Sequence, residues 1–197
     1  MKKKHTLLIA NKQNKLKTSY QTLHNNGIPI IKMNQTHSSN IQIITTPPKK
    51  RITTILNTDG LITNQKNIAI AVKFADCMPI IIQAHGYLCL LHSGRKGTQK
   101  KIIQKAISQL KNLTQKDTNF QIWIGPHICN LCYEINKKTN ETYDMLSQAI
   151  IQIKSELDIS KNTLSIHTEC TKKSKNYYSY RGNNYTKKRN FFICYQQ

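Results

Sequence analysis

The sequence comprises 197 residues, with six cysteines and a formal net charge of +21. A chain of this length can bury a hydrophobic core without disulfide staples, so we predict a single domain over residues 1–197. No apolar run approaches the length of a transmembrane helix, and the run at residues 6–10 is too short for a signal peptide. These features favour a cytoplasmic protein without membrane association, whose thiols are reduced or bind metal.

Lysine carries most of the positive charge. Of the 30 basic residues, four are arginine, namely Arg51, Arg95, Arg181 and Arg189. A dense positive field binds nucleic acid by counterion release, but recognition of bases and phosphates favours the bidentate arginine side chain. The lysines accompany an excess of asparagine and isoleucine, as codon drift in an A/T-rich genome produces. We therefore expect no nucleic-acid partner, with a basic nucleic-acid-binding protein on an inactive enzyme scaffold as the alternative.

The N-terminal part of the chain gives few structural signals. Residues 1–27 are polar and rich in lysine, and we expect the more structured part to begin at Ile28. His37 ends the next pattern, a turn follows it, and alternation predicts a strand over residues 41–46. Residues 47–51 form a loop with two prolines.

The centre of the chain, residues 68–110, is expected to contain apolar strands, a turn and an amphipathic helix. The β-branched run at residues 68–74 alternates little, which predicts a strand covered on both faces of its sheet. Cys77 interrupts the first apolar run and His92 closes the second. The two residues should therefore meet at the edge of a buried sheet.

The remaining predicted elements complete a mixed α/β domain. The spacing of apolar residues indicates a helix over residues 139–157. The other predicted elements are turns and short strands: a turn at 57–60, strands at 61–63, 120–124, 164–167 and 190–195, and a basic and aromatic segment at 172–181.

His37, Cys77 and His92 are the first candidate site. Two imidazoles and a thiolate are suitable ligands for zinc, and three protein ligands with one open position are typical of a catalytic zinc site. Bound zinc would polarise a substrate and lower the pKa of water. The spacing alone leaves open a buried thiol with two structural histidines.

Gly94 and Gly97 bracket a turn before a helix that we predict to begin at about Thr98. Glycines let the backbone approach a ligand, and a helix N-terminus with the cations Arg95 and Lys96 attracts anions. The pattern matches neither a Walker motif nor a dinucleotide-binding fingerprint. An ordinary strand-to-helix connection therefore remains the alternative.

Two further groups of residues lie in the C-terminal half of the chain. Cys129 and Cys132 form a C-x-x-C pair behind His127, but no second pair at zinc-ribbon spacing follows, and Cys170 and His167 are the only late candidates. We do not expect a structural zinc there, nor a thioredoxin-like site. Residues 177–189 interleave aromatic and basic side chains, which could stack on bases, but we interpret them as a strand–loop–strand with exposed lysines.

Seven short motifs stand in order from about Asn34 to the C-terminus. They are NQTH (34–37), TDGLIT (58–63), ADCMP (75–79), HSGRKG (92–97), IGPHICNLCYEI (124–135), ECT (169–171) and YSYRG (178–182). This series resembles the laccase-domain family, whose members are described as multicopper polyphenol oxidases or as purine nucleoside phosphorylases of the YfiH type.

The resemblance implies a YfiH-like α/β (α+β) fold, a four-layer α-β-β-α sandwich with mixed sheets, here with a shortened part before about residue 34. It also implies a metal site on His37, Cys77 and His92, usually zinc, with copper possible. The implied reaction converts adenosine, inosine, guanosine or methylthioadenosine and phosphate to free base and ribose 1-phosphate, with adenosine deaminase activity alongside. Because a single zinc is redox-inert, we rank polyphenol oxidation low.

The chain departs from the family pattern around the expected anion site. The family motif H-A-G-W-R-G is here HSGRKG, which lacks the tryptophan and places Lys96 at an arginine position; the S-Y-R-R motif keeps only Arg181. We place phosphate binding on Gly94, Lys96, Gly97 and Arg181. The departures put substrate specificity and rate in question.

Two other enzymatic hypotheses use the same residues. Cys77 could act as the nucleophile of a cysteine hydrolase with His92 as its base. The other hypothesis is an enzyme that removes a wrongly attached amino acid from peptidoglycan precursors, a role also proposed for the family. The oligomeric state is not predicted.

Overall fold

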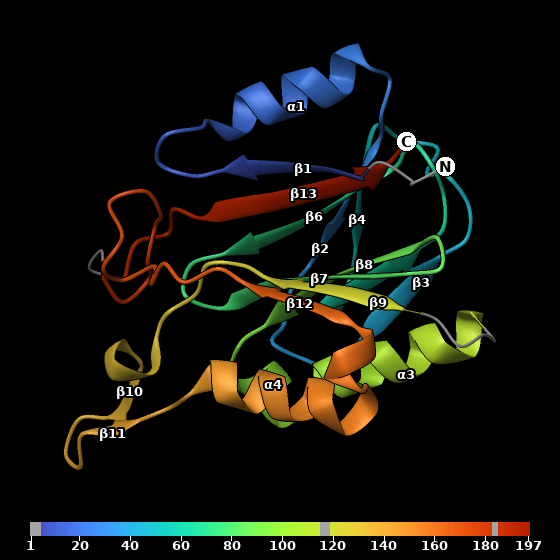
Figure 1. Cartoon of the computed structure of the whole chain (residues 1–197). Helices are drawn as coiled ribbons and strands as arrows, with labels where there is room; N and C mark the ends of the chain where they lie inside the picture. Colours follow the sequence, from blue (N-terminus) through green and yellow to red (C-terminus); the bar gives the residue numbers. More distant parts are fainter. Residues whose placement is uncertain (1–4, 115–118, 183–184) are drawn as a thin grey trace.

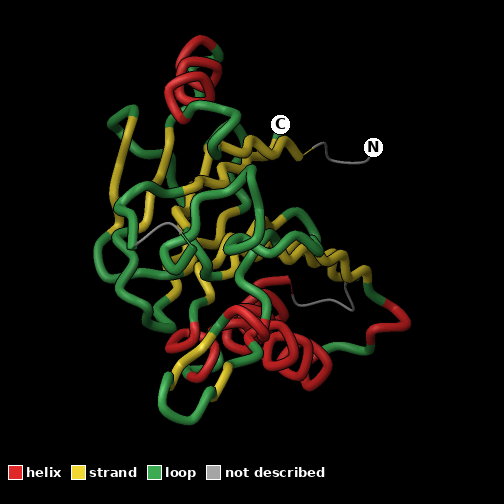
Figure 2. Tube along the Cα trace, turned by 90° about the vertical axis from the view of Figure 1, so that its left-hand side faces the viewer, coloured by secondary structure: helices red, strands yellow, loops and turns green. Residues whose placement is uncertain are grey.

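The computed structural model describes residues 5–114, 119–182 and 185–197. Its layers follow one another as helix α1 (Leu16–Asn25), a five-stranded sheet, a six-stranded sheet, and helices α3 (Ile102–Thr114) and α4 (Met145–Glu156) (Figure 1). The orthogonal view in Figure 2 keeps this order. The predicted four-layer α-β-β-α fold with mixed sheets is therefore confirmed.

The sheet beneath α1 mixes parallel and antiparallel pairs. Strand β6 pairs antiparallel with β13 and parallel with β2, which pairs parallel with β4. In spatial order the strands are β1 (His5–Ala10), β13 (Asn190–Gln196), β6 (Ala69–Phe74), β2 (Ile30–Met33) and β4 (Ile52–Ile55).

The second sheet is also mixed, and its centre is the antiparallel pair of β7 and β8. The register of this pair sets Pro79 opposite His92, so the ends of the two strands lie together. In spatial order the strands are β12 (Thr163–Ile166), β9 (Phe120–Ile124), β7 (Met78–Ala84), β8 (Tyr87–Ser93), β5 (Gly60–Thr63) and β3 (Ile41–Ile44).

Three apolar clusters fill the spaces between the four layers. Alternation divides each central strand between two of them, because successive side chains point to opposite faces. In β6, Ile70, Val72 and Phe74 face the other sheet, whereas Ala69 and Ala71 face α1. The prediction that residues 68–74 form a strand covered on both faces is confirmed.

The apolar sequence around Cys77 belongs to two sheets rather than one. Strand β6 ends at Phe74 in the first sheet, and β7 begins at Met78 in the second. The three residues between them carry the chain from one sheet to the other. Asp76 has a positive φ of 93°, a conformation that is uncommon for a residue with a side chain. Cys77 therefore lies at the edge where the sheets face each other.

The structure corrects the expectation that order begins at Ile28. Strand β1 and helix α1 precede that residue, and β4 was also not predicted. Helix α1 is mostly polar and buries only Ser19 and Leu23, so its sequence lacks a broad apolar stripe. The N-terminal residues 1–4, part of the same expectation, lie outside the described residues.

Two predicted helix starts were wrong. Residues 95–99 already form helix α2 (Arg95–Gln99), so Gly97 lies inside a helix rather than at the end of a turn. Helix α4 starts at Met145, not at 139, because the Asp144 side chain caps it by accepting from Ser147 N at 3.0 Å. The preceding residues form a hairpin of β10 (Glu134–Asn136) and β11 (Glu141–Thr142), which projects beside the helices in Figure 1.

Two 3₁₀ helices complete the elements, η1 (Asn130–Cys132) and η2 (Ile159–Lys161). All six cysteines are free thiols. Among the residues that the structure describes, every helix is too short or too polar to cross a bilayer.

Candidate functional site

His37, Cys77 and His92 come from three separate parts of the chain and meet at one point. Their potential ligand atoms all lie within 4.8 Å of one another, with Cys77 Sγ 3.9 Å from His37 Nε2. The two imidazole rings meet edge to face at 4.9 Å between centroids. His37 is exposed, Cys77 is half-buried and His92 is buried, so the group opens to solvent on one side.

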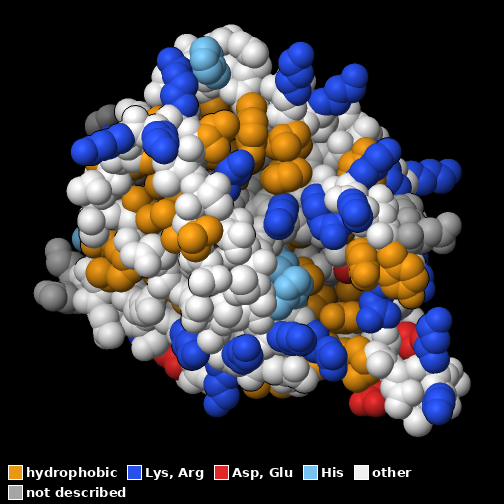
Figure 3. Space-filling view, turned by 180° about the vertical axis from the view of Figure 1, so that it is seen from behind, with side chains coloured by type: hydrophobic (Ala, Val, Ile, Leu, Met, Phe, Trp, Pro, Cys, Tyr) orange, Lys and Arg blue, Asp and Glu red, His pale blue; other side chains and the backbone are white. Residues whose placement is uncertain are grey.

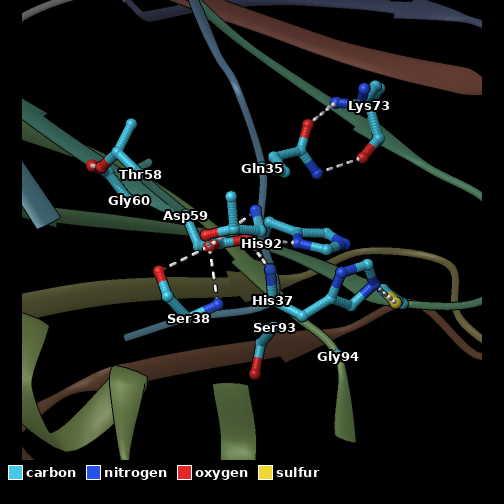
Figure 4. A network of polar contacts seen from close by, with 12 residues as sticks. Gln35, His37, Ser38, Thr58, Asp59, Gly60, Lys73, His92, Ser93 and Gly94 are labelled. Carbon is cyan, nitrogen blue, oxygen red and sulfur yellow. Dashed lines mark hydrogen bonds and ion pairs between the residues drawn. The ribbon is translucent and has the colours of Figure 1, made fainter. Parts of the chain in front are cut away.

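Asp59, which directly precedes strand β5 of the second sheet, organises this group. Its carboxylate accepts hydrogen bonds from the backbone N–H groups of His37 and Ser38, at 3.0 and 2.7 Å. It also bonds His92 Nδ1 at 2.8 Å. Figure 4 shows both histidine rings on one side of this carboxylate. His37, whose φ is 58°, is held in the left-handed conformation by these bonds.

The bond to Asp59 leaves Nε2 of His92 available as a ligand atom. A histidine that binds metal through one nitrogen commonly donates its other N–H to a carboxylate, which fixes the tautomer and the ring. The possible metal ligands are two imidazoles, of which that of His92 is held in this way, and one thiolate. This set of ligands fits a divalent metal such as zinc. The residues present therefore suit the metal that the family resemblance implies.

Asp76 fixes the backbone on the other side of Cys77. Its carboxylate accepts from Thr171 Oγ1 at 2.8 Å and from the backbone N–H of Arg181 at 2.9 Å. These bonds tie the connection between the two sheets to a loop that is distant in sequence. They stabilise the unusual backbone at Asp76 and so set the position of the next residue, Cys77.

Without metal, charge in the group is shared between Cys77 and His92. Burial raises the pKa of the Cys77 thiol, but His92 and His37 outweigh burial and lower that pKa to about 6. Burial lowers the pKa of His92, but Cys77 and Asp59 raise it to about 9. Burial also opposes ionisation of Asp59, yet its bonds with His92 and Ser38 hold that pKa well below the ordinary value. The arrangement favours a thiolate beside an imidazolium.

The group lies in a cavity of about 610 Å³, a volume within the range of small-molecule sites. Five cationic residues line this cavity: Lys73, Arg95, Lys96, Arg181 and Arg189. Figure 3 shows lysine and arginine side chains around a central histidine on one face of the molecule. Three tyrosines also line the cavity: Tyr133, Tyr180 and Tyr185. The cavity therefore contains side chains that can bind a metal, cationic side chains that can bind an anion, and aromatic surfaces.

Aromatic rings hold the two arginines of the C-terminal part. The Arg181 guanidinium lies 4.7 Å from the centroid of Tyr133, and that of Arg189 lies 5.7 Å from the centroid of Tyr180. Both arginines also donate to backbone carbonyl groups. Such contacts limit side-chain motion and so keep the two positive charges at the cavity wall.

Gly94 and Gly97 are close to the group of His37, Cys77 and His92 but do not line the cavity. A β-carbon at Gly94 would lie 2.7 Å from Cys77 Sγ, and one at Gly97 would lie 3.0 Å from the backbone oxygen of Ser38. Both glycines therefore permit close packing around His37 and Cys77. Helix α2 has five residues, and its cations reach the cavity through the side chains of Arg95 and Lys96.

A second group of possible ligands lies outside this cavity. Cys129, Cys132 and Cys170 have Sγ atoms within 4.8 Å of one another. The sequence indicated the first two and named Cys170 only as a late candidate. His167, the other late candidate, is not part of this group, and its ring packs against Trp123 and Tyr177 instead.

Several residues of the site were not identified from the sequence. Asp59 was interpreted only as part of a turn, although T-D-G is one of the seven motifs. Tyr133 lies in the motif at residues 124–135 and Arg189 in the basic and aromatic segment 177–189, but neither was assigned to the site, because only the fold brings them to the cavity. The segment 177–189 is a loop up to Arg189 in its described part, not the expected strand–loop–strand. Residues 183–184 of that prediction lie outside the described residues.

The fold and the site together define a class of protein: a four-layer α-β-β-α sandwich with a His–Cys–His group between the edges of its two sheets. The chain belongs to the family described as multi-copper polyphenol oxidoreductase laccase, whose model matches residues 8–194. The resemblance stated from the sequence motifs is thereby confirmed.

Solved structures share this architecture at low sequence identity. YlmD from Geobacillus stearothermophilus superimposes with a TM-score of 0.77 at 20% identity, covering 94% of this chain and 81% of that one. YfiH from Bacillus licheniformis gives a TM-score of 0.76 at 16% identity and covers 94% and 82%. These likenesses concern the fold.

Curated relatives carry the name purine nucleoside phosphorylase. One from Campylobacter jejuni is 37% identical over 107 residues, which cover 53% of this chain and 45% of the relative. One from Clostridium acetobutylicum is 31% identical over 147 residues, covering 64% and 62%. The matches thus span about half of the length of the first relative and somewhat more of the second.

Proposed function

We propose that this protein is a zinc-dependent purine nucleoside phosphorylase. The observation that carries the proposal is the cavity in which the His37, Cys77 and His92 group stands among five cationic side chains. The substrates, a nucleoside and inorganic phosphate, require a surface for an aromatic base and cations for a multiply charged anion. The names of the relatives from Campylobacter jejuni and Clostridium acetobutylicum support the same reaction.

In phosphorolysis, a phosphate oxygen forms a bond to ribose C1′ while the bond between C1′ and the purine nitrogen breaks. The purine leaves with the bonding electrons and takes up a proton. We assign phosphate to the side chains of Arg95, Lys96 and Arg181, which line one cavity and can hold an anion in place. Lys96 and Arg181 keep the role expected from the sequence. Gly94 and Gly97, which were expected to contact phosphate through their backbone, do not line this cavity. Their missing side chains permit close packing around His37 and Cys77.

His37, Cys77 and His92 would hold the metal, and Asp59 would orient two of them. When bound, zinc supplies Lewis-acid polarisation to a substrate oxygen or to water. The half-open position of the group, with His37 exposed, provides access for substrate. Tyr133 and Tyr180 offer aromatic surface for the purine. Copper accepts the same donors, so metal analysis of the purified protein tests the choice of zinc.

The experiment is incubation of metal-analysed protein with adenosine and phosphate, with chromatography of ribose 1-phosphate, adenine and inosine. We expect ribose 1-phosphate to form in an amount equal to the sum of the free bases, adenine and the hypoxanthine that phosphorolysis of inosine releases, and inosine to report the deaminase activity. Lys96→Ala should raise the KM for phosphate, whereas Lys100→Ala, whose side chain does not line the cavity, should not. Zinc-loaded protein that forms none of the three products would overturn the proposal.

A second candidate function rests on the thiolate of Cys77 beside His92. This pair is the arrangement of a cysteine hydrolase, in which the thiolate attacks substrate directly. A metal-free protein that is active and is blocked by alkylation would favour it. Stoichiometric zinc that is lost in Cys77→Ala would favour the phosphorylase. Peptidoglycan-precursor editing stays a prediction of the family resemblance, which an assay on the muropeptide precursor would test.

A further inference from the structure

Three thiols converge outside the first cavity from two segments that are distant in sequence. Cys129 directly precedes the short helix η1, Cys132 is the last residue of that helix, and Cys170 follows strand β12. A parallel bridge between His127 and Cys170 joins the two segments, with Thr171 N donating to His127 O at 3.0 Å. The fold thus supplies the third thiol that the spacing of the C-x-x-C pair lacks.

The geometry of the three sulfur atoms is close to that of a metal site. All three Sγ atoms lie within 4.8 Å of one another. A tetrahedral zinc with bonds of about 2.3 Å holds its sulfur ligands about 3.8 Å apart, so side-chain shifts of about 1 Å suffice. Cys129 N donates to Cys170 Sγ at 3.3 Å, a contact of the kind that orients a thiolate ligand.

The surroundings also suit a bound cation with three thiolates. Cys132 is buried, whereas Cys129 and Cys170 are half-buried and line a cavity open to solvent, which gives an ion a route of entry. Zinc with three thiolates carries a net charge of −1. Lys173 and Lys175 line the same cavity and offset that charge. The one carboxylate there, from Glu169, is bonded to Ser174 and Asn176.

We infer that Cys129, Cys132 and Cys170 form a second metal site, which binds zinc through three thiolates. Soft thiolate donors favour zinc over the alkaline-earth cations. The fourth position is open to water. This inference does not depend on the proposed phosphorylase function.

The site would clamp two loops that build the wall of the first cavity. Tyr133, which stacks on Arg181, directly follows Cys132. Thr171, which directly follows Cys170, bonds Asp76 beside Cys77 at 2.8 Å. A metal on the three thiols would hold Tyr133 and Asp76 in a fixed relation and so stabilise the wall of the first cavity.

The test counts metal in protein purified anaerobically with a non-thiol reductant and added zinc. We expect a first equivalent at the His37 group and a second at the three thiols. The double variant Cys129→Ser/Cys170→Ser should lose the second equivalent only, and Cys77→Ser should lose the first only. Cys89→Ala, which removes a buried thiol outside both groups, should lose neither.

Cobalt substitution provides a second readout that does not require the double variant to fold. In Cys77→Ser no thiolate remains in the first group, so intense sulfur-to-cobalt charge-transfer absorption must arise from the three thiols. X-ray absorption at zinc in the same variant should give three sulfur neighbours.

Three results would overturn the inference: loss of all metal in Cys77→Ser, absence of sulfur-to-cobalt absorption in that variant, or a disulfide among the three cysteines in the anaerobic protein. Because these readouts are independent of turnover, failure of the phosphorolysis assay would leave them unaffected.

Discussion

Asp59 carries more of the site geometry than its turn-like sequence suggests. It accepts from the backbone of Thr36, His37 and Ser38 and also holds His92. A single carboxylate thus sets both the left-handed backbone at His37 and the ring orientation of His92. Its side chain is fully buried, so each of these bonds is shielded from water.

Asp59→Asn tests this role. The amide keeps the size of the side chain but presents an N–H₂ group where the carboxylate now accepts from several donors, and it lacks the negative charge. We expect zinc affinity to fall about 10- to 100-fold, measured by competition with a chromophoric chelator. Asp158→Asn, at an exposed helix cap, is the matched control and should leave affinity unchanged. Equal affinity in both variants would contradict the positioning role of Asp59.

The Cys77–His92 pair gives a pH prediction for metal-free protein. The pKa of Cys77 is lowered to about 6, so its stabilising thiolate is present at higher pH and is lost as pH falls through 6. The pKa of His92 is raised to about 9, so its stabilising charge is present at lower pH and is lost as pH rises through 9. The ion pair should therefore contribute to stability between about pH 6 and pH 9.

Alkylation by iodoacetamide, followed at Cys77 by peptide mass spectrometry, measures the thiolate directly. We expect half-maximal reactivity near pH 6 in metal-free protein, because both histidines favour the thiolate. His92→Gln should move the midpoint toward the ordinary thiol pKa. The buried thiol of Cys194, whose pKa burial raises, should stay unreactive in the same sample. A Cys77 midpoint above pH 8 would contradict the charge assignment.

At the scale of elements, helix α4 shows how one cap fixes a boundary. Its N-terminus depends on Asp144, which accepts from both the backbone N–H and the hydroxyl of Ser147. Asp144→Ala should lower the free energy of unfolding by about 1 kcal/mol, measured by urea denaturation. Asp144→Asn, which keeps a side-chain acceptor, should lose less. An unchanged midpoint in the alanine variant would show that packing against α3, not the cap, fixes the start of α4.

The connection from β6 to β7 is the element that makes the site. Both strands are apolar, and the sequence joined them in one apolar run interrupted near Cys77, but they belong to different sheets. The three connecting residues therefore span the two layers and place Cys77 beside the end of β8, where His92 pairs with Pro79. A continuous strand through Cys77 would have set the thiol within one sheet, away from His37.

At the scale of the whole molecule, the positive charges fall into two groups, those that line the cavity and those that lie on exposed faces. Five cations line the cavity, whereas other lysines cover exposed faces, as Figure 3 shows for one side. Binding that arises from diffuse charge weakens steeply with salt, because it depends on counterion release.

We therefore expect binding to a short DNA duplex, followed by fluorescence anisotropy, at low ionic strength only. It should vanish near physiological salt. Binding that persists there, and that survives His37→Ala and His92→Ala, would instead favour the nucleic-acid-binding alternative.

The sequence alone determined the apolar strands of the centre and the identity of the His37, Cys77 and His92 group. Strands covered on both faces leave a strong local signal, since nearly every position is apolar. The motifs identified the three residues even though His37 and His92 are 55 positions apart. Helix α1 and strand β1 were missed because few of their side chains are buried, so their sequences show little periodicity.

Only the tertiary structure decided which residues surround the group. Asp59, Tyr133 and Arg189 lie in motifs or segments that the sequence singled out, but their place around the group could not be assigned, because contacts between distant segments depend on sheet order and register rather than on neighbouring residues. The same holds for Gly97, which local chemistry assigns to a turn but which lies in a helix where its missing side chain admits the Ser38 backbone. Cys170 joins Cys129 and Cys132 for that reason too: the bridge between two loops, not the spacing of the cysteines, brings the third thiol into place.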